Sequence, residues 1–172
     1  RLVEMVTELV AEEPVEIALA DTIGVAVPQQ VEDAFTTLKA IVGDIPLRAH
    51  FHDTRNTGIG NAYAAVKAGV TTLDASIGGI GGCPFAPNAT GNIATEDLVY
   101  MLNRSGVEHG VALETLIEGA QWLQVVLDKS VPSSLLRAGD FLPKVEGLAW
   151  MRAGEFSMKP GMWYFLRSIS GM

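Results

Sequence analysis

Hydrophobic and polar residues along the chain follow two alternating patterns. Apolar residues that recur every three or four positions predict helices over 2–10, 28–42, 59–66, 95–102 and 113–127. Short apolar runs between these segments predict strands over 16–20, 46–51 and 70–75, the last of them rich in β-branched residues. Pro14, Gly43 and Gly69 fall where the first three helices are expected to end. Thr95 is the expected N-cap of the fourth helix.

The order of these elements indicates an α/β fold. Strands that are separated by helices are expected to pair in parallel through crossover connections. Three strands are few for this class, since a flavodoxin-like sheet has about five and a (β/α)8 barrel has eight. Two interpretations therefore stay open. The chain forms a minimal sheet, or it is the C-terminal part of a barrel whose first strands are absent.

Composition narrows the class of protein further. The chain has 172 residues, is 48% hydrophobic and carries a formal net charge of −8, which is typical of a globular domain and argues against a nucleic-acid partner. Its single cysteine excludes an internal disulfide, and no apolar run is long enough for a membrane span. The first residue is Arg1, which leads us to expect that the chain begins partway through a longer protein.

Charge and aromatic content change near position 143. Residues 1–142 carry a formal charge of −10, whereas residues 143–172 carry +2 and contain three tryptophan or tyrosine residues and four methionines, namely Trp150, Trp163, Tyr164, Met151, Met158, Met162 and Met172. We predict one folded unit over 1–142 and an atypical tail of uncertain structure over 143–172. A membrane-surface or partner-binding segment is one interpretation of the tail, and a terminal extension or a sequence foreign to the fold is the other.

Polar side chains follow each predicted strand at its carboxyl end, where α/β folds bind ligands. Asp21 follows the first strand, His50 and His52 end the second, and Asp74 ends the third. Residues i and i+2 of a strand point the same way, so the two imidazoles lie about 6–7 Å apart at their Cα atoms and are placed to chelate one metal ion. A pair of hydrogen-bonded histidines is the alternative. For both aspartates a structural role and a role in the site stay open.

A glycine-rich segment over 78–91 carries two further candidates. It lacks the Lys-Ser/Thr end of a phosphate-binding loop, and its glycines permit hinge motion. Cys83 within it is a candidate general acid or base, although a lone cysteine is more often an inert hydrophobe. Asn92 at its end is either a metal ligand through its amide oxygen or a helix cap.

Three sequence blocks together resemble the 3-hydroxy-3-methylglutaryl-CoA lyase family. They are DTIG over 21–24, HFHDT over 50–54, and the long block from GIGGCP at 79–84 to GNIATEDLVY at 91–100. The resemblance runs from residue 1 to about residue 141. His-x-His alone would indicate only the wider superfamily of metal-dependent lyases and acyltransferases, and the Gly-Gly-Cys-Pro run points to the lyase branch.

The resemblance implies a TIM barrel whose sixth, seventh and eighth strands are the three predicted here. It implies that His50, His52 and Asn92 bind Mg²⁺ or Mn²⁺, that Cys83 is catalytic and that Asp21 is an active-site aspartate. The implied reaction is cleavage of 3-hydroxy-3-methylglutaryl-CoA to acetyl-CoA and acetoacetate. The alternatives are an acyltransferase that condenses an acyl-CoA with a 2-oxo acid, and a non-catalytic fragment or interaction module.

One departure from the family is large. The first-strand motif, with its catalytic arginine and metal-binding aspartate, is absent, so we expect the isolated chain to be inactive. The expected partners are an acyl-CoA substrate and a missing N-terminal half or a second copy of the chain, with no nucleic acid and no membrane span. A cytoplasmic location is expected, or the mitochondrial matrix if the source is a eukaryote.

Overall fold

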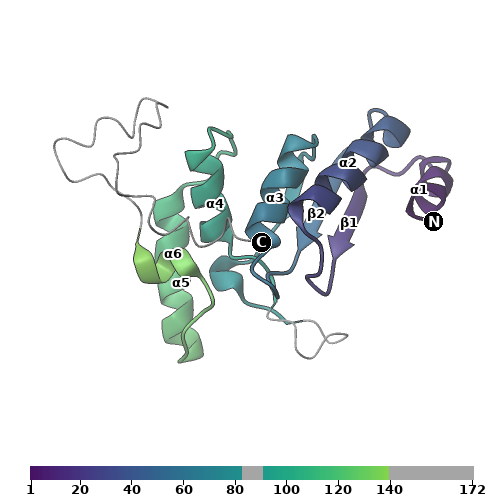
Figure 1. Cartoon of the computed structure of the whole chain (residues 1–172). Coiled ribbons are helices and arrows are strands. Elements are labelled where there is room, and N and C mark those ends of the chain that lie inside the picture. The colour runs from purple at the N-terminus through teal and green to yellow at the C-terminus, as the bar shows by residue number, and fades with distance from the viewer. Residues whose placement is uncertain (83–90, 140–172) are drawn as a thin grey trace, which may run out of the picture. The chain divides into compact units, whose positions relative to one another are not determined.

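The computed structural model describes residues 1–82 and 91–139, which belong to one compact unit over Arg1–Gly139. Helices and strands alternate along it (Figure 1). In chain order the elements are α1 (Leu2–Val10), β1 (Ile17–Asp21), α2 (Pro28–Val42), β2 (Leu47–Phe51), α3 (Gly58–Lys67), β3 (Thr72–Asp74), the 3-10 turn η1 (Ile77–Gly79), α4 (Thr95–Arg104), α5 (Leu113–Leu127) and α6 (Ser134–Ala138). The predicted boundary after residue 142 and the predicted tail lie outside the described residues.

The three strands form one parallel sheet in the order β1-β2-β3. Each strand is joined to the next by one helix, α2 or α3, as the alternation of apolar patterns predicted. The register sets Ala20 beside His50, and His50 beside Asp74. The polar residues at the ends of the strands are therefore neighbours across the sheet. The α/β class is confirmed, and the partial barrel stays a prediction.

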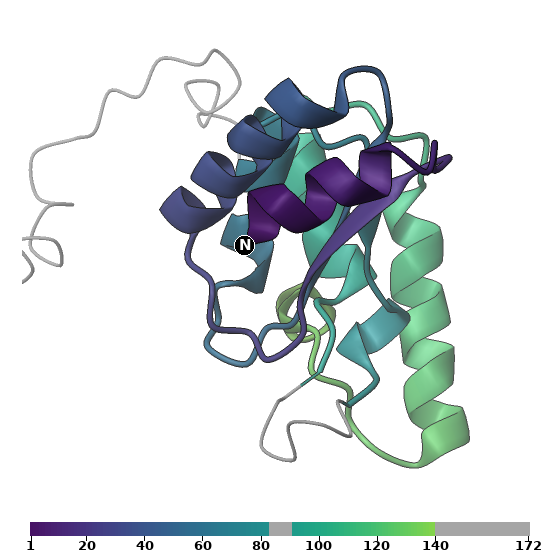
Figure 2. The same ribbon diagram turned by 90° about the vertical axis from the view of Figure 1, so that its right-hand side faces the viewer.

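One face of the sheet is apolar and covered by helices. Figure 2 shows α2 and α3 on one side of the strands. Leu47, Ala49 and Phe51 of β2 are buried on this face and belong to the same core as Phe35 and Leu38 of α2. This burial of large apolar side chains is the main source of stability for the unit.

The opposite face of the sheet carries small and polar residues. Strand alternation places Ala20, Arg48, His50 and Asp74 there, and Ala20 is exposed. A polar sheet face supplies no core by itself. It is the face on which a binding site can be built.

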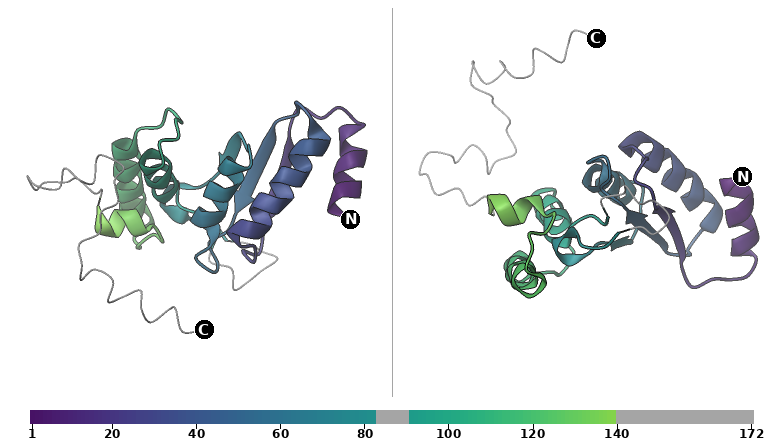
Figure 3. Two further views of the ribbon diagram at one scale, coloured as in Figure 1. Left: turned by 45° about the horizontal axis from the view of Figure 1, so that its top comes forward. Right: turned by 90° about the horizontal axis from the view of Figure 1, so that it is seen from below.

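Helices α4, α5 and α6 pack together beyond β3, as the two views of Figure 3 show. Val99, Leu113 and Leu135 form their small shared core. The short elements η1 and α6 have too few residues to produce a period and were not predicted. No described helix is long and apolar enough to cross a membrane.

The start of α4 differs from the prediction by one residue. Ala94 is the N-cap and Thr95 is the first helical residue, and the N-cap makes no side-chain hydrogen bond. Asp97 of the first turn instead accepts hydrogen bonds from the backbone of α6, from Ser134 N–H at 2.9 Å and Leu135 N–H at 2.7 Å. The acidic first turn of α4 is therefore used for tertiary contacts, in addition to its favourable place at the positive end of the helix dipole.

Candidate active site at the strand ends

His50 and His52 lie on the same side of the chain at the carboxyl end of β2. Their ring centroids are 5.1 Å apart and their planes are inclined at 57°. In an extended chain, residues i and i+2 point to the same face, which explains why the rings of His50 and His52 lie side by side. The predicted juxtaposition of the two rings is confirmed, and their binding of a metal stays a prediction.

Asn92 is brought to this histidine pair by a local antiparallel bridge. The bridge pairs Asn92 with His52, and Asp53 N–H donates to the Gly91 carbonyl oxygen at 2.9 Å beside it. The Asn92 amide nitrogen donates to the Ile80 carbonyl oxygen at 3.0 Å, so the amide oxygen is the atom available to a neighbouring donor or cation. Because Ala94 is the N-cap of α4, the capping interpretation of Asn92 is wrong.

The surroundings of His52 favour its neutral form. The side chain is buried, and its Nδ1 atom has no hydrogen-bond partner among the described residues. Burial lowers the pKa of His52, and the nearby His50 lowers it further, while Asp21 and Asn92 oppose the shift. A neutral imidazole with an unused buried nitrogen is the form that binds a metal ion.

The carboxylate of Asp21 is used by the loop that follows β1. One oxygen accepts the Val25 N–H at 3.0 Å, and the other accepts the Ala26 N–H at 2.9 Å. Its negative charge favours the protonated form of His52 and so raises the pKa of that side chain, against the larger effect of burial. This geometry gives Asp21 a role in shaping the loop, and its catalytic role stays a prediction.

Arg48 is a site residue that the sequence analysis missed. Its Nε lies 2.6 Å from a Glu16 carboxylate oxygen, and its other guanidinium arm lies 2.6 Å from Asp74 Oδ1. The second oxygen of Asp74 lies 3.5 Å from His50 Nδ1. Arg48 precedes His50 by two positions on the same strand, and this spacing was the signal that would have placed it on the histidine face.

The loops after β1 and β2 are tied to each other. A guanidinium nitrogen of Arg55 donates to the carbonyl oxygens of Ile23 at 3.2 Å and Gly24 at 2.9 Å. Asp53 accepts the Gly58 N–H at 2.8 Å at the start of α3, and burial raises the pKa of its carboxyl group. These contacts fix the loops beside the histidine pair and do not involve the two imidazole rings.

The glycine-rich segment starts from a buried anchor. Glu96 has no exposed surface, and both of its oxygens lie 3.1 Å from the Gly78 nitrogen. Glu96 had no assigned role in the sequence analysis. Cys83 lies outside the described residues, so its predicted role is untested.

The donor atoms of the described side chains can be compared with what a divalent cation requires. No group of three or more His, Cys, Asp or Glu residues within 1–82 and 91–139 is placed to hold a metal ion. Two imidazoles and one amide oxygen, from His50, His52 and Asn92, form a neutral donor set, and the partnerless Nδ1 of His52 fits a ligand role. Mg²⁺ and Mn²⁺ favour carboxylate oxygens. His50, His52 and Asn92 therefore fit Mg²⁺ or Mn²⁺ as three of its ligands. At least one carboxylate ligand is needed in addition.

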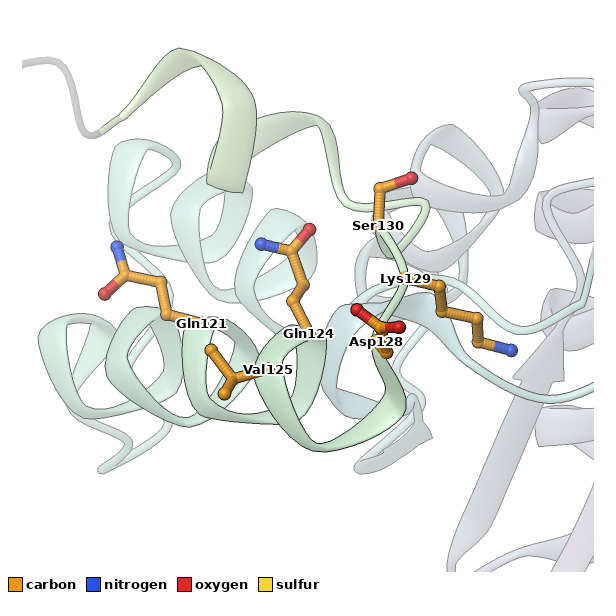
Figure 4. A pocket seen from close by; sticks show the side chains of 6 residues that line it. All are labelled: Gln121, Gln124, Val125, Asp128, Lys129 and Ser130. Atoms are coloured by element: carbon orange, nitrogen blue, oxygen red, sulfur yellow. The ribbon is translucent and has the colours of Figure 1, made fainter.

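Two hollows in the described unit lack convergent chemistry. One of about 500 Å³ lies at the C-terminal end of α5, where the side chains of Gln121, Gln124 and Lys129 point in different directions (Figure 4). Gln124 is already used there, because its side-chain oxygen accepts the Val131 N–H. A second hollow of about 190 Å³ between β1 and α2 includes Asp21 but is otherwise lined mainly by apolar residues. The strand ends are therefore the best candidate site.

A family model matches most of the chain, including the strand ends. The family model described as HMGL-like matches residues 1–123. The chain belongs to the HMGL-like family. All the strand-end residues assembled above, from Asp21 to Asn92, fall inside the matched region.

Named relatives in the HMGL-like family are lyases. The chain is 47% identical over 134 residues to (R)-citramalyl-CoA lyase of Chloroflexus aurantiacus, covering 78% of this chain and 42% of that protein. It is 45% identical to hydroxymethylglutaryl-CoA lyase YngG of Bacillus subtilis, covering 71% of this chain and 41% of that protein. The chain thus spans about two-fifths of the length of these relatives.

A solved structure of the same family has the same arrangement of elements. An HMG-CoA lyase from Acinetobacter baumannii, in complex with coenzyme A and 3-methylmalate, superposes with a TM-score of 0.77 at 38% identity. The match covers 83% of this chain and 47% of that chain.

Proposed function

We propose that this chain is the metal-ligating, C-terminal portion of a divalent-metal-dependent lyase that breaks a carbon–carbon bond in a 3-hydroxyacyl-CoA. The observation that carries the proposal is the His50–His52 pair, joined by Asn92, at the end of a parallel strand in an HMGL-like chain. We infer further that β1, β2 and β3 are the sixth, seventh and eighth strands of a (β/α)8 barrel. Active sites of such barrels lie at this end of the strands.

The names of the relatives narrow the substrate class. Hydroxymethylglutaryl-CoA and citramalyl-CoA each carry a methyl group and a hydroxyl on the carbon β to the thioester. Loss of the hydroxyl proton and cleavage of the adjacent carbon–carbon bond turns the alcohol into a ketone. The bonding pair passes to the thioester as an enolate, which becomes acetyl-CoA when it takes up a proton. We propose 3-hydroxy-3-methylglutaryl-CoA, or a similar tertiary 3-hydroxyacyl-CoA, as the substrate.

Each residue has a role in this proposal. His50, His52 and Asn92 hold the Mg²⁺ or Mn²⁺ ion, which when bound supplies Lewis-acid polarisation of the substrate hydroxyl. Cys83 in the glycine-rich segment donates the proton to the enolate carbon. Asp21 holds the loop after β1 in place through Val25 and Ala26 and keeps negative charge close to His52.

The rest of the site comes from outside this chain. A neutral donor set binds a hard cation weakly, and the developing enolate needs a cationic partner. We propose that an N-terminal half supplies a carboxylate ligand and that cationic group. By itself, the 172-residue chain is then inactive.

Two preparations test the proposal. The purified chain, assayed with Mg²⁺ or Mn²⁺ and hydroxymethylglutaryl-CoA, should release no acetoacetate. A chimera that joins the N-terminal portion of the Chloroflexus relative to residues 1–142 should release acetyl-CoA together with acetoacetate or pyruvate, and the co-product identifies the substrate. His50→Ala in the chimera should abolish release. A chimera that folds and binds the metal but only condenses acetyl-CoA with a 2-oxo acid would replace the lyase proposal with an acyltransferase.

A further inference from the structure

We propose that Asp74, itself held by Arg48, is a positioning residue that fixes the imidazole of His50 with Nδ1 protonated and Nε2 free to bind a ligand. This inference rests on the proposed metal role of His50. It assigns a function to the charged network of Glu16, Arg48 and Asp74, which ends at the predicted ligand His50.

The sheet register brings the three side chains together. Asp74 is the direct neighbour of His50 across the β2–β3 pairing, and Arg48 precedes His50 by two positions on the same face. Asp74 divides its two oxygens between them. Oδ1 lies 2.6 Å from Arg48, and Oδ2 lies 3.5 Å from His50 Nδ1.

Arg48 fixes the direction in which the Asp74 carboxylate points. Its guanidinium is planar, and it is held on its other side by Glu16 at 2.6 Å. Asp74 and Arg48 are each about one-third exposed, so an unsupported carboxylate there would change rotamer readily. A guanidinium held between two carboxylates removes that freedom.

The chemistry of the carboxylate decides the tautomer of His50. A neutral imidazole carries one proton, on either Nδ1 or Nε2, and an ionised carboxylate can only accept. Asp74 facing Nδ1 therefore favours the Nδ1–H form, which leaves the Nε2 lone pair for a cation. Carboxylates that orient metal-binding histidines in this way raise metal affinity about 10- to 100-fold.

The tautomer can be measured in the metal-free chain. Long-range proton–nitrogen NMR spectra at about pH 8 distinguish the two neutral forms of each histidine. His109 is an internal reference for the other form, since its Nδ1 accepts the Val111 N–H at 3.1 Å and its Nε2 lies 2.9 Å from Asn103 Oδ1. We expect Nδ1–H at His50 and Nε2–H at His109. An Nε2–H form at wild-type His50 would overturn the inference.

A near-isosteric substitution supplies the variant test. In Asp74→Asn the side-chain oxygen stays with Arg48, so the NH₂ group faces His50 Nδ1 and should switch His50 to the Nε2–H form. Glu16→Gln keeps a side-chain oxygen that can accept from Arg48 Nε, so Asp74 should stay in place and the tautomer of His50 should not change. A purely structural role for Asp74 predicts no tautomer switch in a folded Asp74→Asn protein, and that result would overturn the inference. If the variant does not fold, the wild-type spectrum still decides.

Metal titration separates this inference from the proposed function. Mn²⁺ binding, followed by electron paramagnetic resonance, should be about 10- to 100-fold weaker in Asp74→Asn than in the wild type or Glu16→Gln. Wild-type protein that binds no Mn²⁺ while His50 is in the Nδ1–H form would count against the metal site and support the positioning. Equal Mn²⁺ affinity in wild type and Asp74→Asn would overturn the positioning role and leave the metal site standing.

Discussion

A methyl group on Gly81 would lie 2.6 Å from the side-chain amide nitrogen of Asn92. Gly81 also has a φ of +111°, a backbone conformation that other residues rarely adopt. The amide of Asn92 therefore occupies space that exists only because position 81 has no side chain. This relationship connects the glycine-rich segment to the proposed ligand set.

Gly81→Ala should displace the Asn92 amide and weaken metal binding. The new methyl group has to move either the Asn92 side chain or the backbone of the segment, and the positive φ adds about 1 kcal/mol or more of strain. Mn²⁺ affinity of the purified chain should fall several-fold. Gly82→Ala is the matched control, since a Cβ at position 82 meets nothing within 4 Å and should leave the affinity as in the wild type. Equal losses in both variants would contradict the Gly81–Asn92 relationship.

Stability should decrease on acidification because of His52. Its pKa is lowered from 6.5 in the folded protein, so the unfolded chain takes up a proton first as the pH falls. The free energy of unfolding should therefore decline as the pH drops below about 6.5 and level off below the folded-state pKa. Urea unfolding of the metal-free chain at a series of pH values between 8 and 5 measures the slope.

Substitution of His52 measures how much of the pH dependence of the free energy of unfolding comes from this residue. His52→Gln has no imidazole to protonate and should flatten the decline, whereas His109→Gln, in the loop before α5, should not. Asp53 acts in the opposite direction: its pKa is raised from 3.8, so its contribution to stability is lost as the pH rises through the folded-state value. An unchanged slope in His52→Gln would show that His52 is accessible to protons in the folded state.

Asp97→Ala should loosen α6. Asp97 accepts hydrogen bonds from Ser133 Oγ at 3.0 Å and from the backbone N–H groups of Ser134 and Leu135, so its removal leaves three donors without that partner. The free energy of unfolding should fall by about 2 kcal/mol. Asp33→Ala removes a carboxylate that accepts one exposed bond from Gln29, and it should cost less than about 0.5 kcal/mol. Comparable losses in the two variants would contradict the anchoring role.

Cys83→Ser should affect chemistry and leave folding intact. In the active chimera proposed above, a hydroxyl in place of the thiol is a poor proton donor to the enolate. The kcat value should fall by about 100-fold or more with little change in melting temperature. A large loss of stability with normal turnover would instead assign Cys83 to the core.

The elements that bury an apolar face were the predictable part of this fold. The predicted bounds of α1, α2 and α5 agree with the structure, because apolar side chains recur at helical spacing along each helix, although Trp122 and Val125 of α5 are exposed. The last strand was predicted as 70–75 and is shorter, Thr72–Asp74, because its pairing with β2 covers only three residues. Apolar content gives the location of a strand and not the extent of its hydrogen bonding.

Only the part of the site that depends on the alternation of side chains along a strand was predictable from the sequence. The pairing of His50 and His52 follows from their i, i+2 spacing. The Asn92 bridge to His52 depends on how the segment after β3 returns to β2, which no local pattern records. Arg48 was missed because the sequence analysis considered polar residues only at the ends of strands, and Arg48 lies near the start of β2.

The strand order keeps the described side chains of the candidate site within one part of the chain. Each strand pairs with the one before it in the chain, and the Asn92 bridge returns to the strand that carries the histidines. The described side chains proposed to act together thus come from one continuous stretch, Asp21 to Asn92, although the pairings within it join residues 24 to 40 positions apart. On the ribosome the β1–β2 pairing that carries the histidines emerges before α5 and α6, so His50 and His52 can reach their mutual geometry before those helices are available.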